Sequence, residues 1–288
     1  MQPPSPQASM RVTAFPPFAR VAAGALVALA GTSLPLLLVL VIVSRDPPLV
    51  LGQLWFVTFV FSITPALTAM LLKRAYQAEL TLAGDGLVLA GRDRRIEVPF
   101  ESITALEPWR IPLPGFGFAI GLRSGRKLPV TIAVADPAAL GSALAQGGLG
   151  DLSAKLAAHP VSVWGSSKAK WGPHGWVHLF LKFPVFGLLP GGLLFYTHQW
   201  IAYGGPLGQY YQSGLFAWLK TLGVYWLTVV LYMAFYAGVW RGLTEGVCLA
   251  VAFFAPAWAN LARTVMERLS GAAYWLGVPL LLALRYSD

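Results

Sequence analysis

Two long uncharged apolar stretches dominate the first quarter of the chain. Residues 21–44 hold no charged side chain over 24 positions, and residues 49–72 form a second uncharged stretch. A helix needs about 20 apolar residues to cross the hydrocarbon core of a bilayer. The pattern therefore predicts a transmembrane hairpin over residues 20–74. The preceding residues 1–19 are rich in proline and lack apolar periodicity, which predicts an irregular tail.

Residues 75–150 have a different character, because charged residues appear at ordinary density and apolar positions alternate with polar ones. Alternation with a period of two predicts strands. Asp85-Gly86 is typical of a hairpin turn, and residues 124–126 separate a second pair of strand-like segments. Asp136 and Pro137 then suit the N-cap and first position of a helix over 136–145. The segment thus predicts five to seven short strands followed by one helix.

These motifs carry a resemblance. A helix hairpin leading into the AGDG turn, the VPFESI segment and the DPAALGSAL helix resembles the bacterial pleckstrin-homology-like (PH-like) domains of membrane-flanked proteins, over about residues 20–150. The resemblance implies a small β-sandwich or barrel with a C-terminal helix, which docks a protein partner or the membrane surface. The second half of the chain carries no such resemblance.

The second half returns to apolar character. Residues 151–170 are polar and predict a linker, and residues 171–288 predict a membrane domain of three to four helical segments, one of them broken at Pro190–Gly192. The fold class expected is a polytopic α-helical membrane protein of five or six spans with the PH-like domain inserted. Six spans would place Arg263 outside, and a re-entrant or interfacial segment at 245–268 would avoid that.

Composition agrees with a membrane protein. Hydrophobic residues make up 56% and charged residues 11% of the chain, whereas a soluble domain has about 25% charged residues. The single cysteine, Cys248, excludes an intrachain disulfide. The net charge of +9 follows from an excess of basic residues, of which 12 of the 21 lie in 73–170. The positive-inside rule then predicts a cytoplasmic N-terminus and domain. Together with the resemblance to bacterial domains, this implies a multi-pass protein of the bacterial inner membrane. Nothing beyond the charge favours nucleic acid as a partner.

Two basic loops are candidates for docking to lipid headgroups or to a partner. They contain Arg92, Arg94 and Arg95 in one loop, and Arg123, Arg126 and Lys127 in the other. Basic residues near an anionic leaflet each contribute about 1 kcal/mol of binding. The alternative is that both are ordinary solvated loops. The first hairpin, AGDG, is acidic and small, which argues against specific phosphoinositide binding.

The histidines are the remaining candidates for chemistry. His174 and His178 share one helical face at a spacing that can chelate a metal, but His198 lies 20 residues further on, about 30 Å along an unbroken helix. Only a chain reversal between the last two would bring all three together, and the alternative is a polar stripe facing headgroups. Lys220 and Glu245, near the ends of two spans, either pair or bracket an ion path, and the alternative is that both side chains extend to the interface.

The function expected is therefore a non-enzymatic scaffold or accessory subunit without a cofactor, with membrane lipids and a membrane protein as partners. The alternative is a membrane-embedded enzyme or transporter for a lipid-like or small substrate that uses the region of His174, His178 and His198.

Overall fold

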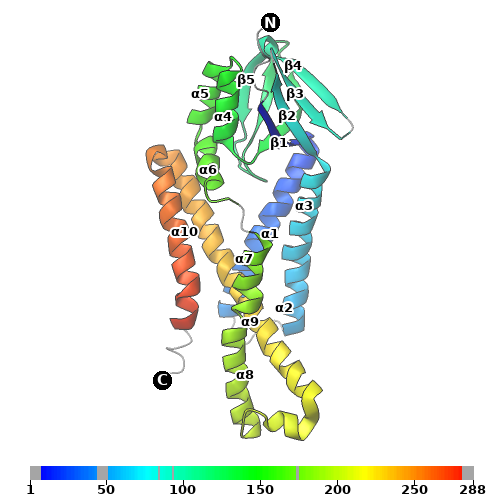
Figure 1. The fold of residues 1–288 in the computed structure, drawn as a ribbon, viewed down its shortest axis with the longest axis vertical. Helices are drawn as coiled ribbons and strands as arrows, with labels where there is room; N and C mark the ends of the chain where they lie inside the picture. The colour runs from blue at the N-terminus through cyan, green and yellow to red at the C-terminus, as the bar shows by residue number, and fades with distance from the viewer. Residues whose placement is uncertain (1–7, 44–50, 84, 93, 173–174, 281–288) are drawn as a thin grey trace. The chain divides into compact units, whose positions relative to one another are not determined.

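The computed structural model describes residues 8–43, 51–83, 85–92, 94–172 and 175–280. The chain folds into two compact units, whose elements are labelled in Figure 1. The sheet unit comprises the described parts of residues 1–30, 60–172 and 245–266, and the helical unit those of 31–59, 173–244 and 267–288. Each unit thus combines segments that are far apart in the sequence.

The sheet unit is built on seven antiparallel strands in the order β4-β3-β2-β1-β7-β6-β5. The strands are β1 (Ala8–Phe15), β2 (Gln77–Ala83), β3 (Gly86–Gly91), β4 (Arg95–Pro99), β5 (Ile103–Pro108), β6 (Gly117–Leu122) and β7 (Lys127–Val134), with a 3-10 turn, η2 (Phe100–Ser102), between β4 and β5. Alternate positions such as Leu87 and Leu89 are buried in the core. Both predicted hairpins are confirmed, since Ala83 pairs with Gly86 and Gly121 with Lys127.

The central strand, β1, lies where an irregular tail was predicted. Ala8–Thr13 pairs with β2 and Val12–Phe15 pairs with β7, so the tail predicted over residues 1–19 is wrong for residues 8–15. The local pattern is short and mixed, and the strand is stabilised by partners at 77–82 and 131–134. Pairing with such remote segments leaves little signal in the strand itself.

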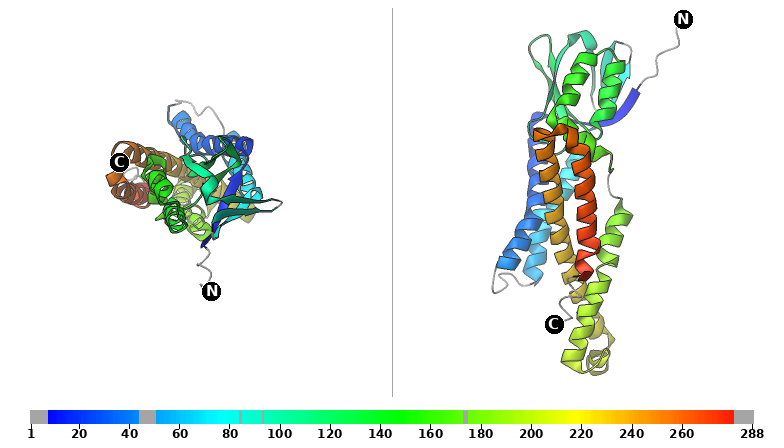
Figure 2. Two further views of the ribbon diagram at one scale, coloured as in Figure 1. Left: turned by 90° about the horizontal axis from the view of Figure 1, so that it is seen from above. Right: turned by 90° about the vertical axis from the view of Figure 1, so that its left-hand side faces the viewer.

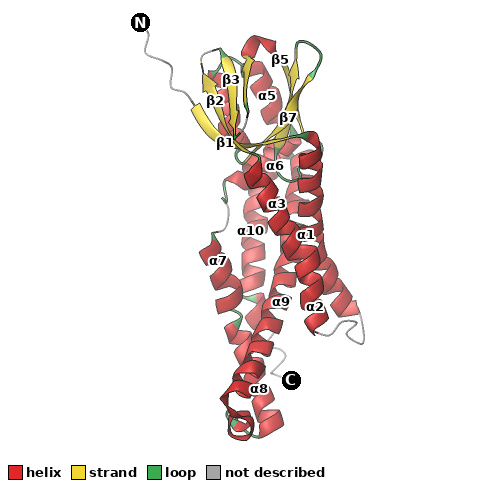
Figure 3. Cartoon of the chain, turned by 90° about the vertical axis from the view of Figure 1, so that its right-hand side faces the viewer, coloured by secondary structure: helices red, strands yellow, loops and turns green. Residues whose placement is uncertain are grey.

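Three helices, α4 (Pro137–Gln146), α5 (Gly150–Ala158) and α6 (Pro160–Ala169), follow the sheet. The N-cap of α4 is confirmed, because the Asp136 carboxylate accepts the backbone N–H groups of Ala138 and Ala139 at 2.9 and 3.2 Å. Figure 2 shows the green helices α4 and α5 against one face of the sheet, and Figure 3 labels α5 there. The linker predicted over 151–170 is wrong, because α5 and α6 occupy this segment and bury Leu156 and Trp164. The polar residues between these two apolar positions obscured the helical pattern in the sequence.

The turn between the last two helices also belongs to the sheet unit. Helix α9 (Gly208–Phe254) is followed by the 3-10 turn η4 (Pro256–Trp258) and by α10 (Ala259–Trp275). Cys248, Ala252 and Ala259 pack against Trp164 of α6. The residues 247–259 are therefore the end of α9 and its turn, so Arg263 lies in the same unit as the sheet.

Four helical runs in the described residues are long and apolar enough to cross a membrane: Pro17–Val43, Leu51–Ala75, Trp176–Tyr203 and Gly208–Phe254. The protein is accordingly a multi-pass helical membrane protein with a separate antiparallel sheet. The predicted count of five or six spans is not confirmed, because α10 is not one of these four runs. In the helical unit, Leu37 of α1 (Pro17–Val43), Leu54 of α2 (Leu51–Thr58) and Phe235 of α9 form one buried cluster.

Two of the spans contain π-helical turns beside a proline. The turn η1 (Phe59–Ile63) links α2 to α3 (Thr64–Ala75), and η3 (Leu181–Val185) links α7 (Trp176–Phe180) to α8 (Leu188–Tyr203). Pro65 follows the first turn and Pro184 lies inside the second. A proline lacks an N–H and clashes with the carbonyl four residues earlier, and a π turn widens the helix at that point. The predicted break at Pro190–Gly192 instead lies within α8.

Candidate functional site

The sheet joins the first two spans almost directly. One residue, Pro16, separates β1 from α1, and one residue, Tyr76, separates α3 from β2. The backbone N–H of Ala14 donates to the Tyr76 carbonyl at 2.9 Å. Because β1 and β2 are neighbouring strands, the start of α1 and the end of α3 lie at the same end of the sheet.

The turn between β3 and β4 lies at this end as well. The register pairs Ala78, the second residue of β2, with Gly91, the last residue of β3. The Gly91 N–H donates to the Arg94 carbonyl at 2.8 Å, which closes the turn. The antiparallel register therefore carries Arg92 and Arg94 to the junction between sheet and spans.

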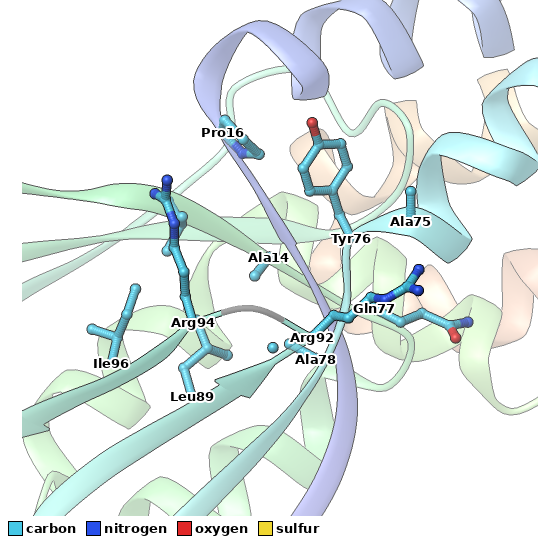
Figure 4. Close-up of a pocket in the computed structure, with 12 residues that line it drawn as sticks. Ala14, Pro16, Ala75, Tyr76, Gln77, Ala78, Leu89, Arg92, Arg94 and Ile96 are labelled. Carbon is cyan, nitrogen blue, oxygen red and sulfur yellow. The ribbon is translucent and has the colours of Figure 1, made fainter.

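These segments enclose a hollow of about 320 Å³, the junction hollow. Its lining residues are Ala14, Pro16, Ala75, Tyr76, Gln77, Ala78, Leu89, Gly91, Arg92, Arg94, Ile96 and Val130. Figure 4 shows Arg94 extending toward Pro16 and Arg92 extending beside Gln77, with the Tyr76 ring between them in this view. The lining thus combines apolar side chains with hydrogen-bond donors, an arrangement suited to an anion that carries an apolar part.

Both arginines of the junction hollow are exposed. Among the described residues, neither guanidinium forms an ion pair with a carboxylate. Other cations lie close along the chain, since Lys73 and Arg74 occupy the last turn of α3. Arg20 of α1 lies over the Trp109 ring at 4.7 Å. The junction is therefore basic, as expected where spans end on an anionic leaflet.

The structure separates the six basic candidates predicted from the sequence. Arg95 pairs with Glu97 at 2.8 Å, and Lys127 pairs with Glu107. Arg123 and Arg126 are exposed at the β6–β7 turn and do not line the hollow. Of the six, Arg92 and Arg94 are the two that line the junction hollow. Tyr76 and Gln77 were missed, although the pairing of Ala78 with Gly91 in the β2–β3 hairpin brings them close to the arginines. Counting that register back from the predicted turn would have found them.

The histidines are not brought together. His174 lies outside the described residues. His178 on α7 and His198 on α8 belong to one continuous helical run, so their separation is about 30 Å. The His198 ring contacts those of Tyr203 and Tyr225, with centroids 6.0 and 5.2 Å away. Across the described part of the chain, no group of three or more His, Cys, Asp or Glu side chains is placed to hold a metal.

A second polar cluster, the ion-pair cluster, joins three helices of the sheet unit. Glu245 of α9 accepts a hydrogen bond from Arg263 of α10 at 2.9 Å and forms an ion pair with Lys168 of α6 at 3.0 Å. Arg263 is completely buried, whereas Lys168 is 43% exposed. The predicted alternatives for Glu245 are thus replaced by pairing with two cations that are distant in the sequence. Lys170 adds a hydrogen bond to Asn260 at 3.0 Å.

Comparisons of the chain with protein-family models, with curated proteins and with solved structures found no match. The fold and the junction define a class all the same: a multi-pass membrane protein whose sheet domain is fused without a linker to its first two spans. The function must be argued from that geometry.

Proposed function

We propose that the protein is a non-enzymatic scaffold or accessory subunit of the bacterial inner membrane, with a cytoplasmic domain of PH-like type. The observation that carries the proposal is the direct continuation of α1 and α3 into the paired strands β1 and β2. One residue at each junction leaves the sheet little freedom to turn away from the bilayer. A domain fixed in this way is suited to positioning a partner at the membrane surface.

Two further observations support the details. Seven antiparallel strands followed by α4 agree with the PH-like resemblance. The 12 of 21 basic residues that lie in 73–170 favour a cytoplasmic side for this domain. The lipid surface and a neighbouring membrane protein are the two partners that such a domain can engage at once.

Cysteine labelling tests the orientation. In a Cys248→Ala background, Ser213→Cys before the kink in α9 and Ser124→Cys in the β6–β7 turn both introduce an exposed thiol. A membrane-impermeant maleimide added to intact cells should label Ser213→Cys, and should label Ser124→Cys only after permeabilisation. The reverse pattern overturns the proposed orientation.

Crosslinking and metal analysis test the role. A photoreactive residue at Ser124 should yield one discrete crosslinked protein that copurifies in stoichiometric amount. About one tightly bound zinc or iron per chain, lost in His178→Ala but kept in His159→Ala, would instead favour the embedded enzyme. The second variant is the control, because His159 caps α6 in the sheet unit.

A further inference from the structure

We propose that the junction hollow binds the phosphate group of an anionic lipid headgroup. The inference rests on the proposed function, because it takes the sheet unit to lie on a leaflet. It adds a defined site and a ligand chemistry to that role. The site differs from the acidic AGDG hairpin, which lies at the opposite end of β2 and β3.

The position of the junction hollow is the first argument. Pro16 precedes the first residue of the span Pro17–Val43, and Ala75 is the last residue of the span Leu51–Ala75. The ends of two apolar spans mark the boundary between hydrocarbon and headgroups. A hollow lined by residues at both ends therefore opens at the level where lipid phosphates are found.

The chemistry of its lining is the second argument. Arg92 and Arg94 supply planar guanidinium forks, which match the oxygens of a phosphate better than a lysine ammonium does. The Tyr76 hydroxyl is a further donor. Leu89, Ile96 and Val130 add apolar surface for the glycerol and upper acyl groups of a lipid. The volume of about 320 Å³ suits a headgroup and not a whole lipid.

The contrast with the other basic turn is the third argument. Arg123 and Arg126 also flank a turn between strands, are exposed, and carry the same charge. They do not line the junction hollow, so any attraction they exert on lipids should not depend on it. Arg95 is engaged by Glu97. The two pairs of arginines thus provide a matched comparison of equal charge inside and outside the junction hollow.

The experiment uses the full chain in an uncharged detergent and isothermal titration calorimetry. The ligands are dihexanoyl phosphatidylglycerol, dihexanoyl phosphatidylcholine and inorganic phosphate. The double variant Arg92→Gln/Arg94→Gln is compared with Arg123→Gln/Arg126→Gln, which removes the same charge elsewhere. All four positions are exposed, so both variants should fold, and thermal unfolding checks that they do.

Saturable binding of phosphatidylglycerol is expected, weakened about 30-fold in Arg92→Gln/Arg94→Gln and less than about threefold in the other double variant. Each basic residue at an anionic surface contributes about 1 kcal/mol of binding free energy, so removing two arginines should cost about 2 kcal/mol. At about 1.4 kcal/mol per tenfold change in affinity, this corresponds to the larger, about 30-fold, weakening. Phosphatidylcholine should bind at least about tenfold more weakly than phosphatidylglycerol.

Three results would overturn the proposal. Equal weakening in the two double variants would mean that binding follows net charge alone. Binding of phosphatidylglycerol that is undetectable in the parent protein, or that is unchanged in Arg92→Gln/Arg94→Gln, would remove the hollow from the role. Inorganic phosphate binding as tightly as the lipid would assign the site to a soluble anion. The labelling of Ser124→Cys and Ser213→Cys tests the orientation separately, so failure of the site and failure of the proposed function remain distinguishable.

Discussion

Replacing Glu245 with glutamine should open the packing of α6 against the α9–α10 turn. The Arg263 guanidinium is completely buried and lies 2.9 Å from the Glu245 carboxylate. Neutralising the carboxylate leaves a buried cation without its counter-charge, which costs about 3–5 kcal/mol. Lys168 is 43% exposed, so Lys168→Met should cost at most about 1 kcal/mol.

The chain contains its own probe for this opening. Cys248 is the single cysteine, is completely buried, and packs in the cluster that joins α6 to α9. Where the cluster recloses faster than a maleimide reacts, the labelling rate follows the population of the open form. A tenfold change in the population of the open form corresponds to about 1.4 kcal/mol. If Glu245→Gln destabilises the closed packing by about 3 kcal/mol, Cys248 should therefore be labelled about 100-fold faster.

The comparison variants sharpen the test. Lys168→Met should label at most about fivefold faster than the parent protein, as expected for about 1 kcal/mol. Arg241→Gln breaks a pair with Glu267 in the helical unit, where Arg241 is 45% exposed, and should leave the rate within about twofold. Labelling of Glu245→Gln within about fivefold of the parent rate would refute the reasoning about the buried charge.

Two other predictions concern packing and pH. In Gly238→Ala the new Cβ would lie 2.8 Å from the Leu34 Cβ, which should cost about 1–3 kcal/mol of stability. Gly242→Ala meets open space and should be neutral or slightly stabilising. Thermal unfolding in detergent compares the two variants, and equal losses of stability would contradict the close approach of the helices at Gly238. Burial lowers the pKa of His159, whose Nδ1 accepts the Val161 N–H at 3.3 Å. The folded protein therefore binds this proton less readily than the unfolded chain, so stability present above about pH 6.5 is lost as the pH falls through the lowered pKa. His159→Asn replaces the capping ring nitrogen with an amide oxygen that does not titrate. It should flatten the change in melting temperature between pH 7 and pH 5, and an unaltered slope would exclude His159 as its source.

The sequence predicted elements whose signals are local. A hairpin was correctly predicted at Asp85-Gly86, although Gly86 is already the first residue of β3 and pairs with Ala83. Asp136 with Pro137 specifies the start of α4, because a cap is set by adjacent residues. Strand β1 escaped prediction because its partners are remote. Arg92 and Arg94 were identified as basic candidates while the hollow was not, because Ala14 and Pro16 enter its lining only through the pairing of β1 with β2.

The ion-pair cluster shows the same limit. Its three members come from α6, α9 and α10, and no spacing in the sequence relates Lys168 to Glu245 or Arg263. Charge and hydropathy alone favoured an interfacial position for Glu245. Only the tertiary packing of these helices reveals that Glu245 compensates a buried arginine.

The position of β1 before the first span has a consequence for biosynthesis. The ribosome completes β1 first, yet its partner strand β2 follows only after a whole transmembrane hairpin. The central strand must therefore wait, unpaired, until both spans have inserted and the chain has returned to the starting side. Completion of the sheet is thereby coupled to correct insertion of the hairpin. A chain that inserts wrongly keeps an unpaired strand edge, which quality-control proteases and chaperones can recognise.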